Sequence, residues 1–415
     1  MAIAAVAAVV AYISIYAFDL AWPPIRSDGF SYYVYLPAVV LHHDLSLETT
    51  AHECCTGDYP RWTAMFRWPS THRWLNPHPI GEALMLGPFF LAAHALTRWS
   101  NLSPDGFSFY YQYAAGLGGL VYFAAGLWFL RRFLLRRFSP GVTLATLLVC
   151  IWGTNLFHYA TYDSIFSHAF AFFLFAALLD QGVRWLEHPT YGHAITVGIL
   201  AGLTILVRHT NALMLWFLVP GAWVGVRDKR LPLTHLAAAA AVTAALLVPQ
   251  IALYRQATGQ WVFSPYAANG RFDFLAPKIV PVLFSPEKGL FFWSPALLLA
   301  LAGFPLLPTY VPGFLLPTLV VLPATLWLIA SWSDWQLGGS FGHRGFTDLL
   351  PIFAIAMACF FDWASRRRWT VPVAVFATVA VTLSIAQMIQ YWLRIIPFSD
   401  TSWTLYKSVF LKFTR

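Results

Sequence analysis

Residues 26–33, with the sequence RSDGFSYY, follow the first hydrophobic segment of the chain. Asp28 therefore lies just beyond the C-terminal end of that segment. The 415 residues are 59% hydrophobic and 11% charged, whereas an ordinary soluble domain is about 25% charged. A carboxylate at the boundary of an apolar segment costs free energy unless it has a partner or a task. The sequence therefore predicts a helical integral membrane protein with a functional acid at one membrane surface.

Apolar segments long enough to cross a bilayer predict about eleven transmembrane helices. They lie at about residues 2–22, 108–130, 140–160, 165–184, 192–207, 210–226, 232–254, 288–307, 310–330, 348–364 and 370–392. The alternation that a membrane barrel needs is absent, so we expect an all-α fold. We expect one domain over residues 1–415 and no separate soluble domain. The first segment lacks a basic start, which favours a retained helix over a cleaved signal peptide.

Three basic clusters orient these helices in the membrane. Residues 131–137, 227–230 and 366–368 hold them, and such clusters face the cytoplasm. With the N-terminus inside, all three do so only if residues 79–98, which are apolar but contain Glu82, lie in the outer interface instead of crossing. Residues 31–44 are expected to form a second interfacial helix. The first extracytoplasmic loop is then 23–107, and the net charge of +8 reflects topology and does not indicate nucleic-acid binding.

Asp28 is the leading candidate for catalysis. Residues 23–24 are both proline and end the first helix, and Gly29 lets the backbone approach a ligand closely. A carboxylate here can take a proton from an acceptor hydroxyl. The alternative is that Asp28 caps the following helix. Tyr32 and Tyr33 lie beside it and are candidates for substrate binding.

Further candidates lie in the other outer loops. Asp163 can place an acceptor or a divalent metal and His168 can contact phosphate; the alternative is a helix cap with a packed histidine beneath it. Arg208 interrupts an apolar stretch, where a guanidinium suits a lipid phosphate, unless it only snorkels to the interface.

Two later loops add cations. Lys288 leads into a span and can lie near the same phosphate; the alternative is interfacial anchoring. His343 and Arg344 follow three glycines within residues 338–342, a composition that lets backbone amides face an anion. Both are candidates for phosphate or sugar contact, against the alternative of a flexible polar loop.

Several site classes find no support. The sequence has no P-loop, no dinucleotide-binding glycine motif and no HExxH zinc motif, so no nucleotide cofactor is expected. Residues 42–44 (HHD) are a weak metal signal. Cys54 and Cys55 are adjacent and could form a strained disulfide, a metal pair or two free thiols. Cys150 and Cys359 lie in apolar runs and are expected to pack.

With these residues in place, the chain resembles the GT-C superfamily of polyprenyl-phosphate-sugar-dependent glycosyltransferases, whose members include protein O-mannosyltransferases and lipid A aminoarabinose transferases. A large group of bacterial membrane proteins in that superfamily is more similar still. The matching stretches, in order, are residues 27–29 with 32–37, 79–90, 153–169, 285–290 and 338–344.

The resemblance implies two interfacial helices in the first outer loop, Asp28 as catalytic base and Asp163 as a second acid. Many relatives carry an Asp-Glu pair where this chain has Asp28 and Gly29, so metal use stays open. It also implies an inverting transfer of a sugar from a polyprenyl-phosphate lipid, with Arg208, Lys288 or Arg344 stabilising the leaving phosphate. The acceptor is a glycan, lipid or protein outside the bacterial inner membrane.

Three other functions compete with this one. A transporter of lipid-linked sugars predicts polar residues in mid-span and repeated halves, and no repeat is visible in the sequence. An O-antigen ligase or polymerase predicts its largest outer loop late in the chain, whereas here the first is the largest. The third is a non-catalytic accessory subunit.

Overall fold

The computed structural model describes the whole chain except residues 1, 19, 56–63, 262–269 and 415. Within this part, five helical segments are long and apolar enough to cross a membrane. They are α6 (Phe109–Leu134), α9 (Ser167–Glu187), α12 (Leu233–Thr258), the continuous pair η4 (Arg344–Leu349) and α18 (Leu350–Arg366), and α19 (Thr370–Trp392). The predicted helical membrane protein is thus confirmed.

Shorter apolar helices account for most of the remaining predicted spans. These include α1 (Ala2–Ala17), α7 (Pro140–Trp152), α10 (Tyr191–Val207) and α17 (Leu315–Ser331). The stretch 210–226 is instead a 3-10 helix, η1 (His209–Phe217), followed by α11 (Val219–Arg227). Pro220 stands at the start of α11, where a missing amide hydrogen costs least.

Two predicted spans are broken. In the stretch 140–160, Gly153 and Thr154 separate α7 from the short α8 (Leu156–Thr161). The stretch 288–307 divides into α14 (Leu290–Trp293), η2 (Pro295–Leu297), α15 (Leu298–Gly303), η3 (Phe304–Leu306) and α16 (Leu307–Tyr310). Prolines interrupt this second stretch because they remove an amide donor and clash with the preceding turn.

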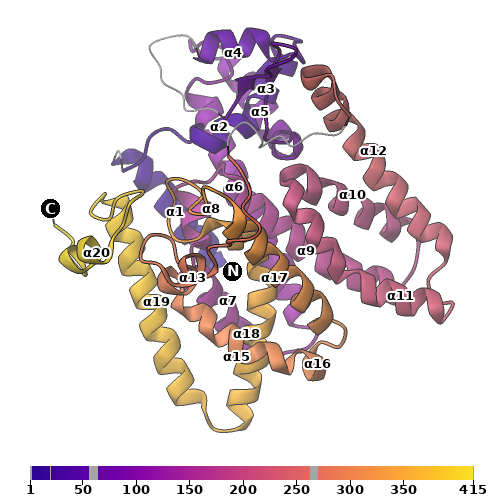
Figure 1. Ribbon diagram of the computed structural model, residues 1–415, viewed down its shortest axis with the longest axis vertical. Helices are drawn as coiled ribbons and strands as arrows, with labels where there is room; N and C mark the ends of the chain where they lie inside the picture. Colours follow the sequence, from indigo (N-terminus) through magenta and orange to yellow (C-terminus); the bar gives the residue numbers. More distant parts are fainter. Residues whose placement is uncertain (1, 19, 56–63, 262–269, 415) are drawn as a thin grey trace.

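The first loop forms a cap at the upper end of the molecule (Figure 1). It contains α2 (Ser27–Tyr33), α3 (Tyr35–Val40), α4 (Glu48–Cys55) and α5 (Gly81–Arg98). A two-residue antiparallel hairpin of β1 (Phe66–Arg67) and β2 (Trp74–Leu75) joins them, with Phe66 opposite Leu75. This hairpin departs from the all-α expectation. Its strands have two residues each, which is too short for an alternating pattern to show in the sequence.

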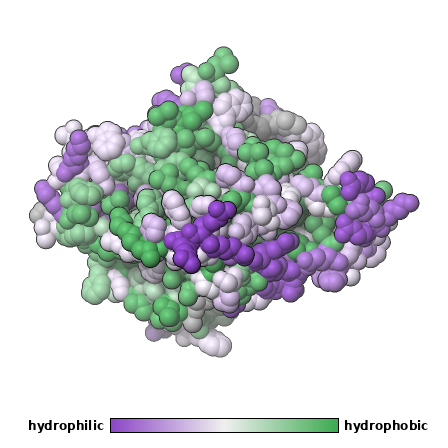
Figure 2. Space-filling model, turned by 90° about the horizontal axis from the view of Figure 1, so that it is seen from below, coloured by the Kyte–Doolittle hydropathy of each residue, from purple (hydrophilic) through white to green (hydrophobic). Residues whose placement is uncertain are grey.

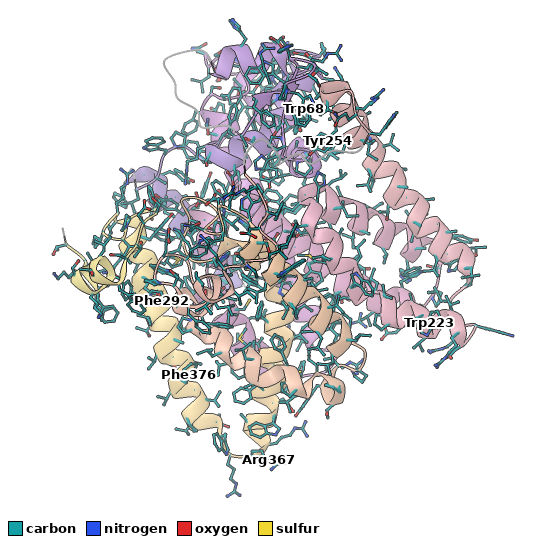
Figure 3. All side chains as sticks on the ribbon, in the orientation of Figure 1. Trp68, Trp223, Tyr254, Phe292, Arg367 and Phe376 are labelled. Atoms are coloured by element: carbon teal, nitrogen blue, oxygen red, sulfur yellow. The ribbon has the colours of Figure 1, made fainter. Side chains whose placement is uncertain are left out.

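Burial divides the long helices into central and peripheral ones. α9 packs against α6, and α18 packs against α15; both α9 and α18 bury most of their residues. α12 runs along the outer edge (Figure 1) and exposes Val248 and Ile251, as a lipid-facing helix does. In Figure 3, Trp68 and Tyr254 lie at the upper end and Arg367 at the lower end.

The remaining helices complete the outline of the chain. α13 (Ile279–Phe284) precedes the broken stretch, and α20 (Trp403–Val409) packs beside the end of α19. Cys150 and Cys359 are buried and free, as predicted for packing residues. The side chains of Cys54 and Cys55 lie outside the described residues.

Candidate functional site

A cavity of about 310 Å³ opens beneath the cap. Its walls come from α2, the start of α9, η1, the end of α17 and η4, which are far apart in sequence. Leu328 and Ile329 give it an apolar side on α17. Its charged and polar lining residues are Asp28, Tyr32, His78, Ser167, His168, Arg208, Thr210, Asn211, Thr325, Asp334, Arg344 and Asp348. We call this space the first cavity.

Asp28 and Arg344 meet in the first cavity. Nη1 of Arg344 lies 2.7 Å from Oδ2 of Asp28, and the side chains are 14% and 31% exposed. Asp28 stands in the first turn of α2 and no side chain caps that helix, so the ion pair, and not a helix cap, occupies its carboxylate. Burial alone would raise the pKa of Asp28, but the charge of Arg344, with smaller contributions from nearby cationic groups, holds it below 3.8.

Gly29 lies tightly against the turn at residues 163–166. A Cβ at Gly29 would lie 2.5 Å from Cγ1 of Ile165 and 3.0 Å from its carbonyl oxygen. No side chain fits there without moving the 163–166 turn. The glycine therefore allows α2 to lie directly on that turn and fixes where Asp28 points.

Asp348 holds three polar groups of the first cavity together. It is 2% exposed, and its Oδ1 accepts a hydrogen bond from Nδ1 of His168 at 2.7 Å. Its Oδ2 accepts from Arg208 at 3.3 Å and from the Asn211 amide at 3.1 Å. Burying a carboxylate costs free energy that several charged donors offset, so this cluster is a stable wall of the cavity.

Arg208 reaches the cavity because the backbone changes direction there. It has extended backbone angles (φ −153°, ψ 124°) between α10 and η1. Its side chain is 24% exposed and pairs with Asp348, so it does not simply snorkel to the interface. Its guanidinium group therefore faces the first cavity from the wall that Asp348 and His168 form.

His78 is a cavity residue that sequence reasoning missed. It is buried, and its Nδ1 makes no hydrogen bond within the described part of the chain. Its ring packs edge-on against Tyr32, with centroids 4.5 Å apart. Burial lowers the pKa of His78 to about 4, with Asp28 opposing and Arg344 adding to the decrease. It is neutral at physiological pH, and its position between two prolines was the only available signal.

Glu82 is a second acid near Asp28. It is fully buried, and neither carboxyl oxygen has a hydrogen-bond partner among the described residues. Burial, reinforced by the charge of Asp28, raises the pKa of Glu82 well above 4.5. Burial thus favours the uncharged form of the Glu82 carboxyl group, which is the form that suits an apolar helix such as α5.

Asp163 lies outside the first cavity. Its Oδ1 is 2.8 Å from Nη2 of Arg26, and its Oδ2 accepts a hydrogen bond from Nε2 of His158 at 2.9 Å. Trp392 donates to Nδ1 of the same imidazole at 2.9 Å, which fixes the neutral tautomer with its proton on Nε2. Burial would raise the pKa of Asp163, but Arg26, His158 and Arg344 together outweigh burial and lower it.

Lys288 and His343 also stand behind the cavity wall. The Lys288 ammonium donates to the carbonyl oxygens of Ser340 and Phe398, the latter at 2.6 Å. Burial, with a contribution from Arg344, lowers its pKa to about 7. His343 is buried against Phe346, and burial lowers its pKa to about 3. Lys288 thus ties the glycine-rich loop at Ser340 to Phe398, and His343 packs within that loop.

Tyr32 and Tyr33 point in different directions. Tyr32 lines the first cavity. Tyr33 is buried, and its hydroxyl donates to the carbonyl of Gly106 at 2.6 Å. Among the predicted substrate contacts, the first cavity thus collects Asp28, Tyr32, His168, Arg208 and Arg344 and leaves out Tyr33, Asp163, Lys288 and His343.

The carboxylates do not form a metal site within the described part of the chain. No group of three or more histidine, cysteine or acidic side chains is placed to hold an ion there. Asp28 is occupied by Arg344 and Asp348 by three donors.

No family model and no curated protein sequence matches the chain. Among solved structures, ArnT from Cupriavidus metallidurans, bound to undecaprenyl phosphate, superposes with a TM-score of 0.54 at 14% identity. The match covers 94% of this chain and 70% of ArnT. The archaeal oligosaccharyltransferase AglB from Archaeoglobus fulgidus, in complex with an inhibitory peptide and a dolichol-phosphate, gives a TM-score of 0.48 at 12% identity. That match covers 99% of this chain and 59% of AglB.

Proposed function

We propose that this chain, which shares the GT-C fold of ArnT, is a membrane glycosyltransferase that moves a sugar from a polyprenyl-phosphate carrier to an acceptor hydroxyl outside the membrane. The single observation that carries this proposal is the Asp28–Arg344 ion pair in a cavity that Arg208 also lines. Such a site brings a proton acceptor and two guanidinium groups within reach of one phosphate-linked sugar. The ligand of ArnT, undecaprenyl phosphate, belongs to the donor class.

In this proposal the protein crosses a bacterial inner membrane about eleven times. The helices of residues 27–40 and 81–98 lie in the outer interface, and residues 1–415 form one domain. The basic clusters at residues 131–137, 227–230 and 366–368 face the cytoplasm, which follows the positive-inside rule. The first cavity then opens on the extracytoplasmic side, where the acceptor is a glycan, a lipid or a protein.

The reaction is a single displacement at the anomeric carbon. The acceptor oxygen attacks this carbon while the bond to the phosphate oxygen breaks, and the carboxylate of Asp28 takes the hydroxyl proton. In-line attack inverts the anomeric centre. Arg344 and Arg208 donate to the departing phosphate, whose charge grows as the bond breaks. Every bond made and broken is accounted for without a further reactant.

The donor also controls the strength of the base. In the empty cavity, Arg344 is bound to Asp28 and keeps the pKa of the carboxyl low. A phosphate that draws Arg344 away removes this influence, and burial then raises the pKa of Asp28 toward the range in which a general base works well. The acid becomes an effective base only when the donor is present.

The other candidates take supporting roles. His168 holds Asp348, and Tyr32 with His78 forms the wall nearest Asp28; these three are assigned to donor or acceptor contact. Lys288, His343, Tyr33 and Asp163 are assigned to positioning, because each lies behind the cavity wall.

The proposal is tested by mass spectrometry of lipids that co-purify with the protein. We expect a polyprenyl phosphate, and we expect its loss when Arg344 and Arg208 are both replaced by glutamine. The exposed Arg98 at the end of α5 provides the control, since Arg98→Gln removes a charge outside the cavity. Equal amounts of isoprenoid phosphate in all three proteins would contradict the proposal.

A further inference from the structure

A second cavity, of about 620 Å³, lies apart from the first. Its walls come from the end of α9, η1, α11 and the 311–314 turn before α17, and they are mostly apolar, with Phe217 and Phe314 among them. Three arginines, Arg136, Arg137 and Arg230, line its rim together with one acid, Glu187. This volume lies in the range of ligand-binding cavities, and nothing in the proposed transfer uses it.

The two cavities lie at opposite ends of α9 and α17, which in the proposed topology are the two membrane surfaces. α9 contributes His168 to the first and Glu187 to the second, and these residues are about 28 Å apart along a helix that rises 1.5 Å per residue. The hydrocarbon core of a bilayer is about 30 Å thick. α17 runs in the same way from the turn at Phe314 to Trp332.

The arginines of the second cavity are unequally engaged. Arg136 pairs with Asp180 at 3.4 Å and with Glu187 at 3.0 Å. Within the described ranges, Arg230 forms an ion pair only with the exposed Asp228, at 3.1 Å, and an exposed pair of this kind contributes little. Arg137 forms no ion pair with any residue that the structure describes. Two guanidinium groups are therefore available for an anion.

The surroundings of the second cavity match the level of lipid headgroups. Trp223 on α11 is 70% exposed and projects at the lower right in Figure 3, and exposed tryptophans mark the membrane interface. Figure 2, which views this end, shows hydrophilic residues gathered at the centre and the right edge among apolar ones. Apolar walls that meet a basic rim at this level fit a molecule with an acyl chain and an anionic head.

We infer that the second cavity binds an anionic membrane phospholipid, with the phosphate diester at Arg137 and Arg230 and an acyl chain along Phe217 and Phe314. The topology proposed above assigns this lipid to the cytoplasmic leaflet. The lipid fills the space between α9, α11 and the start of α17, and so supports the same helices that carry the first cavity at their other ends.

Native mass spectrometry of the full chain tests this inference with phosphatidylglycerol and phosphatidylcholine as probes. We expect phosphatidylglycerol to be retained and phosphatidylcholine to be lost. Each basic residue near a phosphate contributes about a fivefold change in affinity, so Arg137→Gln with Arg230→Gln should weaken binding about thirtyfold. Both side chains lie at the surface, and these variants should fold.

The matched control is Arg367→Gln with Arg368→Gln, which removes the same charge from the same end outside both cavities. We expect the control to bind phosphatidylglycerol as the unmodified protein does, and millimolar inorganic phosphate not to displace it. Equal weakening in both double variants, equal binding of the two lipids, or displacement by free phosphate would each overturn the inference. Asp28→Asn should leave this binding unchanged, which separates it from the transfer reaction.

Discussion

Replacing Asp28 by asparagine should reduce transfer and tighten donor binding at the same time. Asparagine keeps the shape of the side chain but neither takes a proton nor holds Arg344 as an ion pair. Loss of a general base lowers kcat by about 10²–10⁴-fold. The released Arg344 is free to bind the donor phosphate without first leaving Asp28.

The gain in affinity follows from the strength of the ion pair. Charges about 4 Å apart attract by about 4 kcal/mol at an effective dielectric constant of about 20. Lost hydration and side-chain ordering offset most of this attraction in a partly exposed pair, which leaves about 1 kcal/mol. The donor therefore gains about that amount in the variant, or about a fivefold lower Kd.

Two assays on protein in nanodiscs separate these effects. Binding of undecaprenyl phosphate gives Kd without knowledge of the sugar, and single-turnover transfer from radiolabelled donors gives the rate. Asp400→Asn is the matched control, because Asp400 is exposed and its left-handed backbone (φ 60°) accepts asparagine. Full transfer by the Asp28 variant would refute its role as base, and weaker donor binding would refute the competition for Arg344.

Further predictions concern the groups around Asp28. Arg344→Gln should lower kcat/KM by about 10²–10³-fold and move the acidic limb of the pH–rate profile upward, because burial then raises the pKa of Asp28; an unmoved limb would contradict the coupling. Gly29→Ala should reduce the free energy of unfolding by about 1–3 kcal/mol, measured in thermal melts, through the Ile165 clash. Asp163→Ala should lower the free energy of unfolding by about 3 kcal/mol. Because the pKa of Asp163 is lowered in the folded protein, this loss of stability should be largest above about pH 4 and should shrink as the pH falls. Asp348→Asn should lower the melting temperature more than Asp28→Asn does, and the reverse order would argue against its three-donor role.

The sequence was sufficient to predict helices because apolar length is a local property. Every long helix lies where a predicted span lies, and α9 and α19 deviate from prediction by only a few residues. Breaks were harder to foresee. α7 ends at Gly153, where an added Cβ would lie 2.7 Å from the carbonyl oxygen of Val149 and 2.8 Å from Cβ of Ala296. The contact with Ala296 joins residues distant in the chain, so the sequence alone does not show it.

The sequence allowed us to predict which charged residues belong to the candidate site, but not which of them form ion pairs with one another. Asp28 and Arg344 stood out as polar residues at membrane boundaries, where charge is rare. Asp163 stood out for the same reason, yet it is bound to Arg26 behind the wall. Only the three-dimensional packing decides which boundary charges meet a cavity. Asp348 went unnoticed because a single acid ahead of an apolar run looks like a helix cap.

The two arginines of the first cavity differ in how firmly they are held, and this difference predicts an order for the proposed reaction. Arg208 is tied to Asp348, which is 2% exposed and accepts three hydrogen bonds. Arg344 is tied to Asp28, which is 31% exposed. An entering phosphate therefore separates Arg344 from Asp28 at lower cost than it separates Arg208 from Asp348. In the proposed reaction we therefore expect the donor to bind first, because its phosphate would release the carboxylate that takes the proton of the acceptor hydroxyl.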